Sequence, residues 1–168
     1  MKVLPWRSFH EATKGLHLFR LASLDVGSKH VGVAVTDESR MFSSPLRSFE
    51  RLPPRMSPAS IGRLALRLQN LSNEWKVAGF VVGLPLLEKG ELTPLSREIM
   101  ELTEKLSVVN EASNEPCLCT FWNERNTSVR ARRIISTFSG RRSVVLKNKD
   151  TVSASLILQG YIDATKEL

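Results

Sequence analysis

Three acidic residues stand at places in the sequence where chemistry is expected. Asp25 interrupts the apolar stretch LASLDV, Glu124 comes just after CLCTFW, and Asp150 begins the closing stretch DTVSASLILQGYID. A lone carboxylate in a buried strand costs free energy unless something compensates its charge. Each acid also has a structural interpretation, in a turn, at the positive end of a helix or as a helix cap. Asp25 fits that interpretation least well, because it lies inside an apolar run.

The sequence offers few other groups that could act in catalysis. The three histidines, His10, His17 and His30, all lie in the first thirty residues. No Ser or Cys stands in a nucleophile elbow, no phosphate-binding GxxxxGK[ST] loop is present, and no Cys/His cluster has zinc spacing. The sequence therefore argues against hydrolysis by a Ser-His or Cys-His pair.

The order of apolar patterns predicts an α/β fold. Three strands come first, with the third at a sheet edge because Pro45 cannot donate a backbone hydrogen bond. Helices then alternate with strands, which predicts a mixed sheet with helices on its faces. The predicted strands are 21–24, 31–35, 41–49, 77–84, 117–122 and 143–146, and the predicted helices begin at Ser57-Pro58, Thr93-Pro94, Asn126 or Thr127, and Asp150.

This arrangement brings the three acids to one edge of the sheet. Adjacent parallel strands end side by side, and α/β sheets collect their sites there. Carboxylates that converge repel one another unless a cation lies between them. Oxygen ligands without His or Cys select Mg²⁺ or Mn²⁺, and two such ions support hydrolysis at phosphorus. We therefore expect Asp25, Glu124 and Asp150 to be both metal ligands and catalytic residues, with two ions.

The placement of charge indicates the partner. The formal net charge is +7, and residues 125–149 contain eight basic residues and no acid. Such a block can be a merely solvated face. An acid-free run of this length nevertheless favours a polyanion, and nucleic acid before membrane, since no basic amphipathic anchor with large aromatics is present.

The remaining features set the broad class. With 168 residues, one domain is expected, and no apolar run reaches the length of a membrane span. Cys117 and Cys119 are best interpreted as buried small residues in a reducing, intracellular and cytoplasmic setting. Residues 1–19 are predicted to be a flexible or loosely docked extension, and an organelle-targeting remnant is the alternative. A monomer or a weak homodimer is expected.

Four ordered motifs resemble the YqgF family, also called RuvX or Holliday junction resolvase-like proteins. LDVGSKHVGVAVTD resembles the signature DxGxKxxGVAxSD, VVGLP the central strand, NERNTS the DERLTT motif, and KDTVSASLILQGYID the closing helix. The resemblance runs from about Arg20 to Ala164. It implies an RNase H-like three-layer fold over residues 20–168, with a mixed five-stranded sheet and helices on both faces. It also implies a nuclease acting on the 5′ end of precursor ribosomal RNA or on branched DNA.

The resemblance carries the family's acidic site onto Asp25, Glu124 and Asp150. It carries the family's lysine and arginine near these acids onto Lys29 and Arg125. Together with the charge pattern, this predicts a set of residues that bind nucleic acid, namely Lys29, Arg125, Arg130, Arg132, Arg133 and Lys149.

The sequence departs from the family at several positions. Asn123 stands where the family has an aspartate, Asn126 replaces a leucine, and Ser153 and Ser155 dilute an Ala-Ala pair. If the aspartate were the true ligand, the protein would be weakened or inactive. Glu124 is the preferred ligand, and the Asn123 amide oxygen can still coordinate or accept a hydrogen bond.

Two rival interpretations stay open. The DxG turn also opens the actin/Hsp70/sugar-kinase ATPases, but those proteins need two such domains around a nucleotide. A nucleic-acid-binding module that has lost its catalytic site is the other rival, and Asn123 supports it. Metal-dependent cleavage would separate the nuclease from the binding module.

Overall fold

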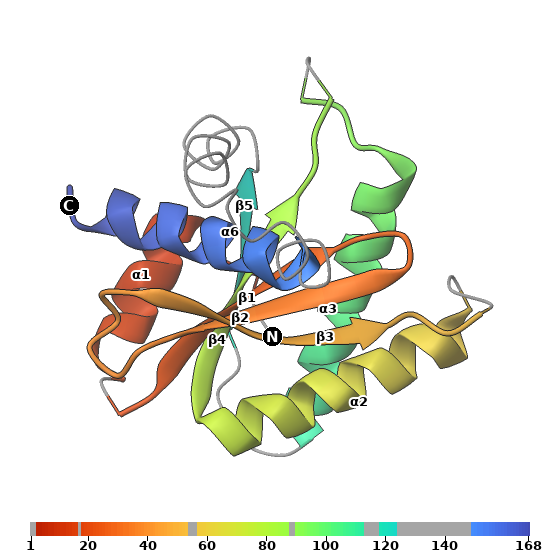
Figure 1. Cartoon of the computed structure of the whole chain (residues 1–168), viewed down its shortest axis with the longest axis horizontal. Helices are drawn as coiled ribbons and strands as arrows, with labels where there is room; N and C mark the ends of the chain where they lie inside the picture. The colour runs from red at the N-terminus through yellow and green to blue at the C-terminus, as the bar shows by residue number, and fades with distance from the viewer. Residues whose placement is uncertain (1–2, 17, 54–56, 88–89, 113–117, 124–148) are drawn as a thin grey trace, which may run out of the picture.

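The computed structural model describes residues 3–16, 18–53, 57–87, 90–112, 118–123 and 149–168, with 107–112 described by backbone alone. In this part of the chain the strands form one mixed sheet in the order β3-β2-β1-β4-β5 (Figure 1). β1 is antiparallel to β2, and β2 to β3, whereas β4 runs parallel to β1 and β5. The strands are β1 (Arg20–Val26), β2 (His30–Thr36), β3 (Ser43–Glu50), β4 (Val77–Leu84) and β5 (Leu118–Asn123).

Helices cover both faces of the sheet. The helices α2 (Pro58–Trp75) and α3 (Pro94–Ala112) lie on one face, and α1 (Trp6–Lys14) and α6 (Lys149–Thr165) on the other (Figure 1). The Ser57 side chain caps α2 by accepting a hydrogen bond from the Ser60 amide, and Pro58 occupies the first turn. The predicted mixed sheet with helices on its faces is therefore confirmed.

Alternation along β1 explains why an acid lies in an apolar strand. Ala22, Leu24 and Val26 belong to the core beneath α2 and α3, whereas Leu21 belongs to the core beneath α1 and α6. Successive side chains point to opposite faces, so Asp25 points to the α6 face. Ser23, on the same face, donates a hydrogen bond to the Ala154 carbonyl of α6 at 2.6 Å. Asp25 is thus directed at α6 rather than into the larger core.

Helix α1, within the predicted N-terminal extension, packs against the sheet and α6. Phe9 of α1 is fully buried and makes an edge-to-face contact with Tyr161 of α6. Trp6 makes a second such contact with Trp122 of β5. The helix can approach because Gly79 of β4 has no side chain: a Cβ there would lie 2.6 Å from the Phe9 ring. Residues 6–14 are therefore part of the packed molecule.

The remaining predicted elements fall into two groups. The strands expected near 21–24, 31–35, 41–49 and 77–84 are present, β3 lies at the sheet edge, and the helices expected after Ser57 and Thr93 begin at Pro58 and Pro94. The expected helix at 126–140 and strand at 143–146 lie outside the described residues. Within the described part of the chain, no helix has the length and apolar character needed to cross a bilayer.

Candidate active site

Asp25 and Asp150 meet where β1 ends and α6 begins. Asp25 is the penultimate residue of β1 and pairs in register with Gly32 of β2. Gly32 contacts the start of α6 so closely that a Cβ at this position would lie 2.0 Å from the Asp150 carbonyl oxygen. The missing side chain at Gly32 therefore allows Asp150, in the first turn of α6, to approach Asp25.

The electrostatics of Asp25 match this crowding. Burial, followed by the negative charge of Asp150, raises the pKa of the Asp25 carboxyl from 3.8 to about 6. A hydrogen bond from the Ser153 hydroxyl and the positive charge of Lys149 act in the opposite direction and offset part of this rise. The ionised form of Asp25 is thus destabilised in the folded protein, and a cation placed between the two carboxylates would stabilise it.

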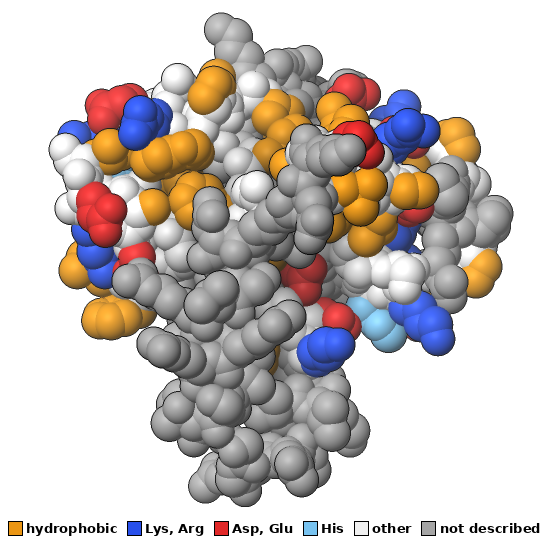
Figure 2. Space-filling model, turned by 90° about the horizontal axis from the view of Figure 1, so that it is seen from above, with side chains coloured by type: hydrophobic (Ala, Val, Ile, Leu, Met, Phe, Trp, Pro, Cys, Tyr) orange, Lys and Arg blue, Asp and Glu red, His pale blue; other side chains and the backbone are white. Residues whose placement is uncertain are grey.

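The rim of the site is polar and accessible. His30, the first residue of β2, places its Nδ1 atom 3.7 Å from Oδ2 of Asp150, and both side chains are well exposed. Lys29, in the β1–β2 turn, and Lys149, the first residue of α6, are exposed as well. Figure 2 looks onto the end of the molecule toward which β4 and β5 run, and shows acidic, basic and histidine side chains gathered together. Among the described residues, exposed basic side chains therefore lie at the same end of the sheet as Asp150.

Some residues of the site were not expected from the sequence. The sequence pattern marks Ser153 only as a departure from an Ala-Ala pair, but its hydroxyl forms a hydrogen bond with the Asp25 carboxylate. A serine three positions after Asp150 lies on the same helix face, which is the signal that could have identified it. His30 was considered for a hydrolytic triad alone. Its position directly after Lys29 in the turn could have placed it beside the acids.

Several predicted site residues lie outside the described part of the chain. They fall within 124–148 and are Glu124, Arg125, Arg130, Arg132 and Arg133. Asn123 is the last residue of β5 and pairs in register with Leu84 of β4. The structure therefore brings together Asp25, Asp150 and Lys149, and the third acid stays a prediction.

The donor set fits a hard divalent cation. Asp25 and Asp150 offer carboxylate oxygens, which Mg²⁺ and Mn²⁺ prefer. Among the described residues, no group of three or more acidic, histidine or cysteine side chains is arranged to hold a metal. Among the described residues, the candidate ligands are therefore two carboxylates, and water or substrate oxygens would complete the coordination of a bound cation.

Solved structures with the same arrangement identify the fold as RuvC-like RNase H. The T. thermophilus RuvC bound to a Holliday junction substrate aligns with a TM-score of 0.54 at 13% identity, covering 88% of this chain and 96% of RuvC. The yeast mitochondrial Holliday junction resolvase aligns with a TM-score of 0.54 at 14% identity, covering 86% of this chain and 78% of that one. The RNase H-like fold expected from the motifs is confirmed.

The chain belongs to the RuvX family, whose model, described as "RuvX: Holliday junction resolvase", matches residues 19–164. A relative from Chloroflexus aggregans is 32% identical over 146 residues, covering 87% of this chain and 94% of the relative. One from Thermoanaerobacter pseudethanolicus is 32% identical over 151 residues, covering 88% and 98%. Both relatives carry the name "Putative pre-16S rRNA nuclease". The suspected family is therefore confirmed.

Proposed function

We propose that this protein is a metal-dependent nuclease that cleaves phosphodiester bonds, with the 5′ end of precursor small-subunit ribosomal RNA as its first candidate substrate. The observation that carries the proposal is the approach of Asp25 and Asp150 where β1 ends and α6 begins in an RNase H-like fold. The names of the curated relatives support the choice of RNA.

The three acids would be the metal ligands. Asp25, Asp150 and Glu124 would ligate two divalent cations, Mg²⁺ or Mn²⁺. When bound, such cations activate a water molecule and stabilise the leaving oxygen at phosphorus. The protein's own part is positioning: Ser153 orients the Asp25 carboxylate, and the contact at Gly32 fixes the start of α6, which carries Asp150.

The basic residues would hold the nucleic-acid backbone. Lys149, at the start of α6, acts on Asp25 through its charge, and Lys29 lies exposed in the β1–β2 turn that follows Asp25. Positive side chains beside a metal site can contact phosphates on either side of the scissile bond, which supplies affinity without reading sequence. Further phosphate contacts would come from Arg125, Arg130, Arg132 and Arg133.

Branched DNA is the second candidate substrate. The description of the family model and the likeness to RuvC bound to a Holliday junction favour it. A nucleic-acid-binding module with little catalysis is a third, and Asn123 at the family's aspartate position favours that one.

One experiment separates these functions. The pure protein is incubated with Mn²⁺ and, in separate arms, a 5′-extended ribosomal precursor RNA, an unrelated single-stranded RNA and a four-way DNA junction. We expect shortening of the precursor that requires Mn²⁺ and is lost in Asp150→Asn. Asp163→Asn, an acid farther along α6, serves as the matched control. Cleavage of the junction alone would favour branched DNA, and binding without cleavage in every arm would contradict the nuclease.

The basic block gives a separate prediction. Replacing Arg130, Arg132 and Arg133 by alanine should weaken nucleic-acid binding about equally for every sequence. The slope of log K against log salt should flatten by up to ~2–3 units, since each neutralised phosphate contributes ~0.7–0.9. Turnover at saturating substrate should change little. Binding measured at several salt concentrations checks this, and an unchanged slope would make the block a solvated face.

A further inference from the structure

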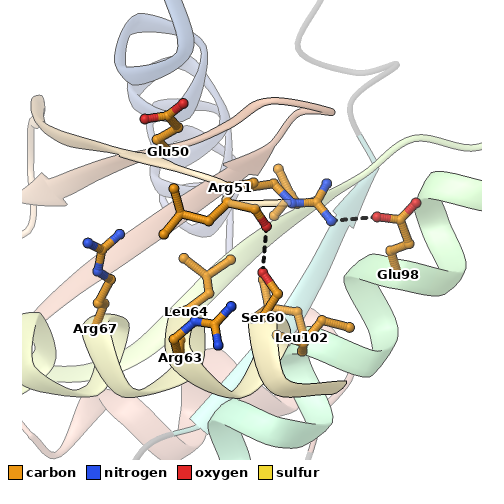
Figure 3. Close-up of a pocket in the computed structure, with 11 residues that line it drawn as sticks. Glu50, Arg51, Ser60, Arg63, Leu64, Arg67, Glu98 and Leu102 are labelled. Atoms are coloured by element: carbon orange, nitrogen blue, oxygen red, sulfur yellow. Dashed lines mark hydrogen bonds and ion pairs between the residues drawn. The ribbon is translucent and has the colours of Figure 1, made fainter. Parts of the chain in front are cut away.

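A buried arginine directly follows β3, on the face of the sheet opposite to the one toward which Asp25 points. Arg51 is 6% exposed, and its Nη2 atom lies 2.5 Å from Oε2 of Glu98, a residue of α3. The pair stands in the wall of a hollow of about 80 Å³ between the sheet, α2 and α3 (Figure 3). The hollow lies on the α2/α3 face, whereas Asp25 points to the α6 face.

Arg51 is bonded to both ends of the β1–β2 turn. Its Nη1 atom donates to the Gly27 carbonyl oxygen at 2.8 Å, and its backbone amide donates to the Lys29 carbonyl oxygen at 2.8 Å. The turn itself is closed by the Gly27 amide, which donates to the His30 carbonyl oxygen at 2.9 Å. Arg51 therefore fixes the three-residue turn from outside, through one side-chain and one backbone contact.

That turn connects residues of the candidate site. Asp25 lies two residues before Gly27, Lys29 lies within the turn, and His30, which follows it, lies beside Asp150. A shift of the turn would move these groups relative to α6. Arg51 is itself anchored, because the next residue, Leu52, accepts a hydrogen bond at 2.8 Å from the Ser60 hydroxyl of α2 (Figure 3).

The energetics suit a positional role. A buried ion pair is seldom the most stable filling, because desolvation of the two charges offsets their attraction, and apolar residues of similar volume often do as well or better. What the guanidinium offers beyond packing is a rigid fork that bonds Glu98 and the Gly27 carbonyl in one geometry. An apolar replacement would fill the space and leave the turn without this anchor.

We propose that Arg51, held by Glu98, is a positioning residue that fixes the β1–β2 turn and thereby the placement of Asp25, Lys29 and His30 for cleavage. The proposal rests on the nuclease function proposed above. Arg51 touches neither substrate nor metal in this role.

The test compares two double variants. R51M/E98L removes both buried charges. R47M/E74L is the matched control, because Arg47 of β3 pairs with Glu74 of α2 at 3.7 Å on the same face but is half-exposed. R51K keeps the charge but lacks the fork. For each, the measurements are the melting temperature, hydrogen exchange of backbone amides in a peptide covering residues 26–31, and kcat and KM on the precursor RNA with Mn²⁺.

We expect R51M/E98L to melt close to the parent while its turn amides exchange faster. Its kcat should fall by about ten- to a hundredfold with little change in KM, as a small misplacement of reacting groups can cost that much. R51K should lie between, and R47M/E74L should match the parent. Unchanged turn exchange, or unchanged kcat despite faster exchange, would overturn the proposal. If the parent cleaves no substrate, the nuclease function fails, and the exchange measurement still decides whether Arg51 fixes the turn.

Discussion

The two ends of the sheet handle charge in opposite ways. At the far end, the Arg40 guanidinium donates to the carbonyl oxygens of Thr13, Leu16 and Phe19, which follow or end α1. At the candidate site, two carboxylates approach each other, and the pKa of Asp25 rises to about 6. The charge of Arg40 stabilises the fold through hydrogen bonds, whereas the charges of Asp25 and Asp150 destabilise it. Such strain is expected where a protein must bind something else.

Asp37 extends the contrast to the acids. It lies just after β2, at the end opposite to the site. Burial opposes its ionisation, but the hydrogen bonds from the Phe42 and Met41 amides and the Ser39 hydroxyl together outweigh burial and lower the pKa of Asp37. Asp25 lies in β1 and Asp37 in the β2–β3 turn. Their pKa shifts in opposite directions separate the acid that stabilises a turn from the acid that is available for chemistry.

The largest effect is expected at Asp25. Asp25→Asn should abolish metal-dependent cleavage while making the metal-free protein more stable at neutral pH. The folded-state pKa of about 6 lies above the usual 3.8, so the ionised form costs ~2–3 kcal/mol, at 1.36 kcal/mol per unit. The free energy of unfolding of the parent should therefore fall by this amount as pH rises from about 4 to 6.

Denaturant unfolding at several pH values without metal measures this loss. The difference between Asp25→Asn and the parent should be near zero below pH 4 and largest above pH 6. Asp163→Asn is the control, since its carboxylate contacts Lys166 on an exposed surface. Full activity of Asp25→Asn with Mn²⁺ would contradict the catalytic role of Asp25. A stability difference that does not change across this pH range would contradict the claim that ionised Asp25 destabilises the folded protein.

At the opposite end, Arg40→Met should destabilise without altering chemistry. Methionine keeps the aliphatic stem and the left-handed backbone of this residue (φ 55°) but removes the charged donor to three carbonyl oxygens, of which those of Thr13 and Leu16 still accept from the backbone amides of Leu16 and Phe19. The expected loss is about 2–4 kcal/mol, because hydrogen bonds from a charged group contribute ~1.5–3 kcal/mol each and do not add fully. Urea unfolding measures it.

The matched control for Arg40 is Arg7→Met. Arg7 is an exposed arginine on α1 that lies over the Trp6 ring, and its loss should cost less than ~1 kcal/mol. The kcat of Arg40→Met, measured well below its melting temperature, should equal that of the parent. A selective loss of kcat would mean that the two ends are coupled, and the contrast between them would not hold.

The smallest effect is expected for Asn123→Asp. It adds a carboxylate at the end of β5, at the position where the family has one, and should raise activity or lower the Mn²⁺ concentration required by a few fold. Asn70→Asp, on the exposed surface of α2, controls for the added charge. Activity measured against Mn²⁺ concentration checks it. A loss of activity would show that the Asn123 amide has a role of its own.

The sequence predicts the contacts that follow from local pattern. The alternation of β1 and β2, the Ser57-Pro58 start of α2 and the apolar run of β4 all specify their elements directly. The approach of Asp25 and Asp150 follows from a general rule about where site residues collect in α/β sheets. These contacts are predictable because each depends on neighbouring residues or on a regularity of sheets.

The rest depends on pairs far apart in the chain. The position of α1 is set by Gly79, some 70 residues later, and a glycine inside an apolar run gives no sign of which helix will cover it. Likewise, the sequence around Arg51 does not indicate that its partners will be Glu98 and the Gly27 carbonyl. Such contacts become visible once the sheet order is known.

The docking of Phe9 on Gly79 also bears on the order of folding during synthesis. α1 leaves the ribosome before every element that it packs against, and about 150 residues separate Phe9 from Tyr161. Contacts this distant in sequence form slowly, because the intervening chain must be ordered first. Although α1 is made before these elements, it should thus be among the last of them to settle, leaving its apolar side open to chaperones until α6 has been synthesised.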